Sequence, residues 1–283
     1  MTAATKWGER YPNLAGFVAS GASVATGVVV TNWIDVIKVR QQLGGTQGGN
    51  FFVTGINIVR KDGPLGLCSG MTPAIARGII YGGARISLYQ PTKDLLGASS
   101  PDSSLALKIT AGMVSGAVAA GITSPTDLIK TNVQSGSGKG SIEVLTGVVR
   151  QGGVTALWKG TTPSMIRAAV LTASQCATYD EVKLFFLRNL GWEDTVGTHL
   201  AVSTVAGLVT ATVISPVDMV KTNIFVNPKY SSPLACAVDI LHKQGVRGMF
   251  RGWGANWARQ GPMTTVIFVT LEALRHEFGL GAF

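Results

Sequence analysis

Three long stretches without charge dominate the hydrophobic pattern of the chain: Asn13–Asn32, Ile109–Thr126 and Gly197–Val217. Each is close to the roughly 20 apolar residues that a helix needs to span a bilayer. The second and third stretches also carry small residues four positions apart, a spacing that lets helix backbones approach closely in lipid. The pattern therefore predicts three membrane-spanning helices that pack against other helices.

Each uncharged stretch is followed by the same succession of elements. A polar linker leads to a short amphipathic helix, expected at Phe51–Lys61, Ser141–Gln151 and Pro233–Lys243, and then to a second long helix. The second helices are expected at about Thr72–Leu96, Thr162–Leu190 and Gly254–Phe278. The succession recurs about every 90 residues, which is typical of an internal repeat. We therefore predict one all-α membrane domain of six transmembrane and three surface helices, with repeats at about 10–98, 103–191 and 195–283.

The repeats are marked by an acidic residue with a lysine three positions later, at the end of each uncharged stretch. Residues three apart lie on one face of a helix, so an ion pair within the helix is one interpretation. The repeat symmetry suggests instead a ring in which each aspartate meets the lysine of the next repeat. The residues of this predicted ring are Asp35, Lys38, Asp127, Lys130, Asp218 and Lys221.

One arginine lies within each second long helix, seven residues after a repeated glycine: Arg77, Arg167 and Arg259. An arginine near a helix end could extend its side chain to the membrane surface. Another polar position follows thirteen residues later, however, which is about 20 Å of helix, so the arginines lie well inside. Charge at that depth usually faces a cavity and has a function. The pattern favours a cationic pocket that binds carboxylate or phosphate groups.

Further polar residues extend this picture in two directions. Arg85 follows Arg77 by eight residues, and its counterpart in the second repeat is Gln175. Both are candidates for substrate contact, although Arg85 could equally pair with a neighbouring helix. A second set of charged positions lies on the other side of the arginines, and two rings around one central site suggest two gates, as alternating access requires. The second set comprises Gln90, Lys93, Asp180, Lys183, Glu272 and Arg275.

The composition supports a membrane protein. Of the 283 residues only 14% are charged, against about 25% in a typical soluble domain. The net charge of +9 could serve nucleic acid, anionic lipid or an anionic substrate, and the basic residues at repeat positions disfavour nucleic acid. The three cysteines and three histidines are scattered without metal-binding spacing, so no metal or cofactor is expected. No nucleophile–base pair or phosphate-binding loop indicates an enzyme, and the N-terminus does not resemble a secretory signal.

The tripled element resembles the mitochondrial carrier family, whose pattern is Pro-x-Asp/Glu-x-x-Lys/Arg on alternate helices, and the resemblance covers nearly the whole chain. It implies a monomeric six-helix barrel with threefold pseudosymmetry in the inner mitochondrial membrane. Both termini are then expected on the intermembrane-space side, with cardiolipin a candidate ligand of the matrix-side surface helices. The aspartate–lysine ring would be the matrix gate, and the second set the cytoplasmic gate.

The sequence departs from the family pattern in each gate. Trp33 stands where the second and third repeats have Pro125 and Pro216, so the first helix is expected to bend less or by other means. Family carriers often brace each matrix ion pair with a glutamine. Gln42 and Gln134 match, whereas the third position is Phe225. The cytoplasmic motif fits fully only in the second repeat, so both gates are expected to be weaker than is usual.

The family's three substrate contact points fall on Arg77, Arg167 and Arg259. Arginine at all three resembles the branch of dicarboxylate carriers, oxoglutarate carriers and uncoupling proteins. The leading hypothesis is exchange of small dicarboxylates or oxodicarboxylates such as malate and oxoglutarate. The alternatives are fatty-acid-dependent proton conduction and a carrier-like scaffold without transport. Nucleotide exchange is disfavoured because Arg167-Ala168 replaces the glycine and aliphatic residue of nucleotide carriers.

Overall fold

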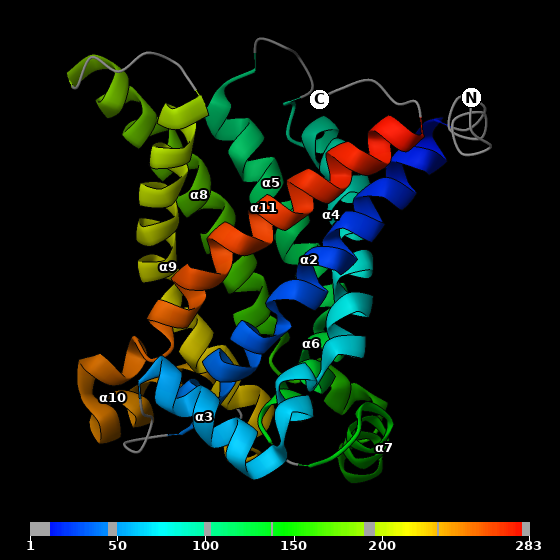
Figure 1. Cartoon of the computed structure of the whole chain (residues 1–283), viewed down its shortest axis with the longest axis vertical. Helices are drawn as coiled ribbons and strands as arrows, with labels where there is room; N and C mark the ends of the chain where they lie inside the picture. Colours follow the sequence, from blue (N-terminus) through cyan, green and yellow to red (C-terminus); the bar gives the residue numbers. More distant parts are fainter. Residues whose placement is uncertain are drawn as a thin grey trace.

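A computed structural model describes residues 12–44, 50–98, 103–136, 138–189, 196–230 and 232–278, and all the regular elements in these ranges are helices. Long helices form a ring in which each packs against the next and the last returns to the first (Figure 1). The predicted all-α architecture is confirmed. In ring order the helices are α2 (Pro12–Leu43), α4 (Met71–Leu95), α5 (Leu105–Ile122), α8 (Thr161–Asn189), α9 (Val196–Val226) and α11 (Trp253–Glu277), and α5 is continued by α6 (Ser124–Gln134).

Three shorter helices lie at one end of the ring, opposite the end at which α2 begins and α11 ends (Figure 1). They are α3 (Phe51–Asp62), α7 (Ser141–Gly152) and α10 (Pro233–Met249). The first two are followed by 3-10 turns, η2 (Pro64–Cys68) and η3 (Val154–Trp158). Gly245 interrupts α10 at the equivalent place with a φ of 65°, so the repeats share this geometry.

The hydropathy of the six long segments is unequal. Within the described residues, Gly21–Leu43, Leu105–Ile122 and Ala201–Val226 are long and apolar enough to cross a membrane by composition alone. These belong to the first helix of each repeat. The second helices, α4, α8 and α11, do not meet this criterion because they carry the arginines and polar residues of the interior.

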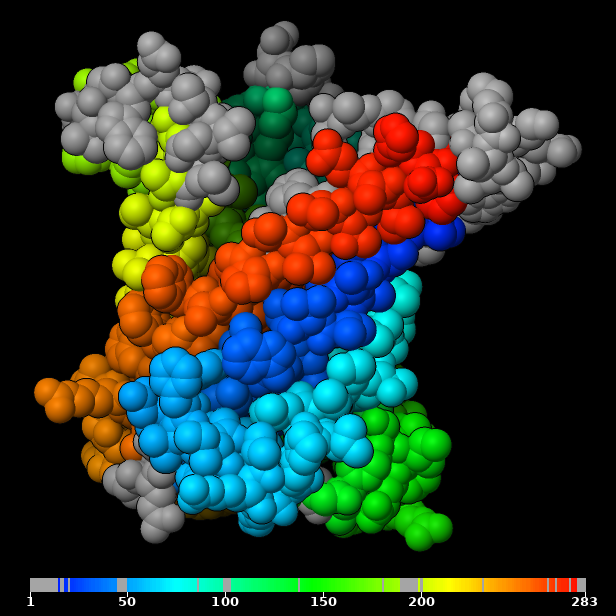
Figure 2. All heavy atoms as spheres, in the orientation of Figure 1, coloured from blue at the N-terminus to red at the C-terminus, as the bar shows by residue number. Residues whose placement is uncertain are grey.

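On the outer face, α2 and α11 lie side by side along their length (Figure 2).

A glycine with positive φ precedes the second long helix of each repeat: Gly70, Gly160 and Gly252, with φ of 69°, 82° and 77°. A side chain on Gly70 would meet Gln134, one on Gly252 would meet Gln42, and one on Gly160 would meet Phe225. These three neighbours are the glutamine-brace positions of the repeats. Only glycine satisfies both the left-handed backbone and the close approach, which explains the repeated glycine seen in the sequence.

The prolines have different effects in the two repeats that contain them. Pro125 lies in the first turn of α6, directly after the break between α5 and α6, whereas Pro216 lies inside the continuous helix α9. The first helix, α2, is also continuous. Trp33 is 43% exposed on its outer face and packs edge-on against Phe51 of α3, with ring centroids 6.0 Å apart. The tryptophan therefore joins α2 to its surface helix and does not face the interior.

Candidate substrate cavity and gate

A cavity of about 470 Å³ lies inside the ring of helices and draws its lining from α2, α4, α6, α8, α9 and α11. All six predicted gate residues of the aspartate–lysine set line it, as do Arg77, Arg167 and Arg259. From that layer the cavity extends along α4, α8 and α11 past Arg85, Gln175 and Ile267, toward the end at which α11 finishes. The predicted arginine layer and the predicted gate are therefore adjacent levels of one cavity.

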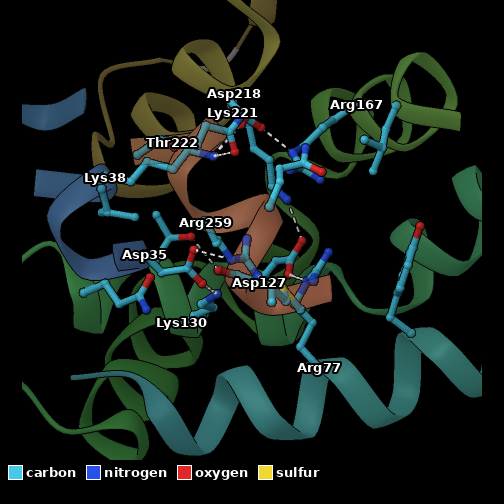
Figure 3. A pocket seen from close by; sticks show the side chains of 18 of the residues that line it. Asp35, Lys38, Arg77, Asp127, Lys130, Arg167, Asp218, Lys221, Thr222 and Arg259 are labelled. Carbon is cyan, nitrogen blue, oxygen red and sulfur yellow. Dashed lines mark hydrogen bonds and ion pairs between the residues drawn. The ribbon is translucent and has the colours of Figure 1, made fainter. Parts of the chain in front are cut away.

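The aspartate–lysine residues form a closed ring between repeats (Figure 3). Lys130 Nζ lies 2.7 Å from Asp35 Oδ2, Lys221 Nζ lies 2.6 Å from Asp127 Oδ2, and Lys38 Nζ lies 2.5 Å from Asp218 Oδ2. Each aspartate therefore meets the lysine of the following repeat, and the pairs do not form within one helix. The side chains are almost entirely buried, at 4–6% exposure for the aspartates.

The three arginines bind the other oxygen of the same aspartates. Arg77 pairs with Asp127, Arg167 pairs with Asp218, and Arg259 Nε lies 3.0 Å from Asp35, each through Oδ1 (Figure 3). Every aspartate thus holds a lysine from one neighbouring repeat and an arginine from the other. Six cations share three carboxylates. We call these nine residues the charge ring. The sequence predicted its members, but not that the arginines would reach the gate aspartates.

Neutral polar groups complete the charge ring unequally. Lys38 also donates to Asn256 Oδ1 at 3.0 Å. Gln134 Nε2 donates to Asn32 Oδ1 at 3.2 Å. Thr222 Oγ1 donates to Gln42 Oε1 at 2.7 Å. At the third brace position, the ring of Phe225 lies 5.2 Å from Lys221 Nζ, a cation–π contact in place of an amide. Sequence reasoning missed Asn256, Asn32 and Thr222, although buried polar residues within helices usually have a partner.

The two walls beyond the charge ring differ. On the side of α4 and α8, Arg85 Nη2 donates to Thr172 Oγ1 at 3.4 Å, and Gln175 lines the cavity nearby. On the side of α2 and α11 the lining residues are Val24, Met263 and Ile267. The walls therefore break the threefold symmetry that the charge ring obeys.

A family model described as mitochondrial carrier protein matches residues 9–100, 101–190 and 193–280. The chain belongs to the mitochondrial carrier family. It is thus a multi-pass transporter of small metabolites in the mitochondrial inner membrane, and the predicted family is confirmed. Among curated relatives, the carrier family protein ucpB of Dictyostelium discoideum is 34% identical over 93% of this chain and 96% of its own length. Citrate transporter F of Aspergillus niger is 33% identical, over 90% and 87%. Brown fat uncoupling protein 1 of Oryctolagus cuniculus is 31% identical, over 92% and 90%.

The residues expected at the second gate of this carrier lie toward the ends of α4, α8 and α11. Gln90 donates to Asp94 of its own helix at 3.1 Å, and Lys93 Nζ lies 5.6 Å from the ring centroid of Tyr89. These contacts are made within α4, unlike those of the charge ring. Glu272 is exposed, and Lys183 is partly buried. Asp180 and Arg275 are among the residues whose side chains the structure does not describe.

Proposed function

We propose that this carrier exchanges small dicarboxylates or oxodicarboxylates, such as malate and oxoglutarate, by alternating access as a monomer. In this proposal the surface helices and the charge ring face the matrix. The cavity and both chain termini then face the intermembrane space. Gln90, Lys93, Asp180, Lys183, Glu272 and Arg275 would close the opposite side when the charge ring opens.

The observation that carries the proposal is the shared use of three aspartates by the lysines and the arginines of the charge ring. An arginine that binds a carboxylate of the protein can also bind a carboxylate of the substrate, since a guanidinium offers several N–H donors to such a group. The arginines approach the aspartates from the cavity, where a substrate arrives. A dianion can therefore compete for two arginines at once, which favours two carboxylates over one.

Competition of this kind connects binding to gating. When a substrate takes Arg167, for example, Asp218 keeps only Lys38, and that junction of the ring is weakened. A ligand drives a conformational change only through its differential affinity for the two states. Here the differential affinity arises because the substrate replaces bonds that hold the ring closed. No covalent step is needed.

Exchange into liposomes tests the proposal. Purified carrier is reconstituted with internal malate, and uptake of labelled malate and oxoglutarate is measured. Arg167→Ala is expected to abolish exchange because Asp218 and the substrate both lose this cation. Arg150→Ala, an exposed position on α7, is the matched control and should exchange as the unaltered protein does. Absence of exchange for all dicarboxylates, or full exchange by Arg167→Ala, would contradict the proposal.

A second candidate is fatty-acid-dependent proton conduction, because two relatives that are 35% and 31% identical to this chain are named uncoupling proteins. The same liposomes distinguish the two. Proton flux that requires palmitate and is inhibited by purine nucleotides favours conduction, whereas counter-exchange of dicarboxylates favours the leading proposal. A carrier-like scaffold predicts neither flux.

A further inference from the structure

Arg85 is the residue of the cavity that the threefold symmetry does not explain. Its counterparts in the other repeats are Gln175 and Ile267. Every cation of the charge ring is paired with an aspartate. Among the side chains that the structure describes, by contrast, Arg85 has no carboxylate partner and makes its hydrogen bond to a neutral threonine. A charge inside a membrane domain that lacks a protein counter-ion is typical of a binding site for an ion or substrate.

The surroundings of Arg85 are polar and closely grouped. A β-carbon placed on Gly116 of α5 would lie 3.6 Å from Tyr81 Oη, 3.7 Å from Thr172 Oγ1 and 3.9 Å from Arg85 Nε. Three polar atoms from α4 and α8 thus converge over one glycine. Gln175 lies one helical turn beyond Thr172 and lines the same cavity. Toward the cavity they present the guanidinium of Arg85, the hydroxyl of Tyr81 and the amide of Gln175, whereas Thr172 is buried and donates to the carbonyl oxygen of Ala168 at 3.1 Å.

Tyr81 connects this group to the charge ring. The guanidinium of Arg77 lies 5.1 Å from the centroid of the Tyr81 ring, while the hydroxyl of Tyr81 lies in the group around Arg85. A single tyrosine side chain therefore contacts one cationic level through its ring and approaches the other through its hydroxyl group. A small molecule held by the charge ring has the Arg85 group directly beside it, on the α4–α8 wall only.

We propose that Arg85, held by Thr172 and flanked by Gln175, forms a further anion subsite, and that the preferred substrate carries a third anionic group. This inference rests on the proposed function, because the first two anionic groups occupy the arginines of the charge ring. The third group is a carboxylate or a phosphate, since a guanidinium with adjacent donors binds both. The apolar side formed by Val24, Met263 and Ile267 accepts the carbon skeleton.

Competition with malate exchange tests the subsite on the unaltered carrier. Glutarate and tricarballylate differ by a single carboxylate on the central carbon, and 3-phosphonoglutarate carries a phosphonate, an analogue of phosphate, on that carbon instead. Tricarballylate is expected to inhibit malate exchange at a concentration about tenfold lower than glutarate, equivalent to about 1.4 kcal/mol. Stronger inhibition by 3-phosphonoglutarate than by tricarballylate would identify a phosphate-like group as the third group. Inhibition by neither beyond that of glutarate overturns the subsite.

Variants then assign the effect to Arg85. Arg85→Gln should remove the advantage of tricarballylate over glutarate, Arg85→Lys should keep part of it, and Arg150→Gln on the surface should keep all of it. If Arg85 only ties α4 to α8, Arg85→Gln will lower the melting temperature and slow exchange of all anions equally, and the inference is wrong. The rise in melting temperature that tricarballylate causes in each variant reports binding, so this measurement makes the test independent of the transport rate.

The same experiments separate this inference from the proposed function. Exchange of dicarboxylates without any preference for a third anionic group leaves the proposed function intact and refutes the subsite. Exchange only of tricarballylate or 3-phosphonoglutarate, lost in Arg85→Gln, supports the subsite and refutes dicarboxylate exchange. Failure of all these anions to exchange or to stabilise the carrier overturns both.

Discussion

The charge ring and the cavity wall beyond it lie side by side but follow different rules. In the ring, each repeat contributes the same aspartate, lysine and arginine, and the bonds repeat around the axis. On the wall, equivalent positions hold Arg85, Gln175 and Ile267, which are a cation, an amide and a hydrocarbon. In the proposed mechanism, opening and closing therefore depend on the symmetric ring, whereas the choice of substrate depends on the asymmetric wall.

Removal of one carboxylate from the charge ring is expected to have the largest effect. Asp127→Ala leaves Arg77 and Lys221 buried without an acid, and a buried pair that loses one partner typically costs about 3–5 kcal/mol. We expect loss of exchange and a large fall in melting temperature in detergent. Asp62→Ala removes the partner of Arg40 near the surface and should cost about 0–1 kcal/mol. Similar melting temperatures for the two variants would remove the distinction between ring and surface.

The amide braces should matter less than the charges that they surround. Gln134→Leu leaves the buried Asn32 Oδ1 without this donor, and an unsatisfied buried group costs about 1–3 kcal/mol. The expected result is a moderate fall in melting temperature with exchange retained at a reduced rate. Phe225→Leu is the comparison at the third brace position, where no buried amide partner is left unsatisfied and a cation–π contact of about 0.5–2 kcal/mol is lost with part of the ring packing. A larger effect at Phe225 than at Gln134 would contradict this order.

The wall should respond in selectivity more than in stability. Thr172→Val removes the acceptor of Arg85 but keeps the volume of the side chain, and the lost hydrogen bond is worth about 0.5–1.5 kcal/mol. We expect a small change in melting temperature and a lower preference for tricarballylate over glutarate. Thr146→Val, on the surface helix α7, is a matched control whose preference should not change. A selectivity equal to that of the unaltered carrier would show that Thr172 does not position Arg85.

The smallest expected effect lies outside the barrel, at the start of α10. Lys243 and Tyr230 donate hydrogen bonds to Asp239, and these bonds lower the pKa of its carboxyl to about 2. Because the folded pKa lies below the usual value near 3.8, the stabilisation is present above that value and is lost as the pH falls toward about 2. Amide hydrogen exchange in α10 should therefore show more frequent local opening in acid. Asp239→Asn should remove the acid dependence, and its persistence in that variant would assign it to other groups.

The aspartate–lysine ring was predictable from the sequence because the repeat fixes both the spacing within a helix and the equivalence between helices. The arginine contacts were not. Periodicity gives the depth of Arg77 in its helix, but it does not say whether the side chain extends toward a substrate or toward Asp127. That outcome depends on the packing of α4 against α6, and such long-range pairings leave no local pattern.

Backbone irregularities were predictable only in part. Pro125 follows a helix break and Pro216 does not, although both occupy the same position of the repeat. Proline cannot donate a backbone hydrogen bond in either case, and tertiary packing decides whether the helix ends there. Likewise, within the described residues, hydropathy identifies only the first helix of each repeat as a membrane span. The second helices carry charged residues that face the interior of the barrel. A hydropathy average along the sequence does not distinguish those residues from residues that face solvent.

The way in which each aspartate joins all three repeats has a consequence for leakage. Two ion pairs cross each junction between repeats, so displacement of one repeat alone breaks four of the six and leaves two. Movement of the first repeat thus breaks most of the ion pairs, and only two remain to oppose movement of the other repeats. If the charge ring is the gate that we propose, partly open forms are rare. A membrane that stores energy as a proton gradient would then gain directly, because ions would find no half-open passage between one turnover and the next.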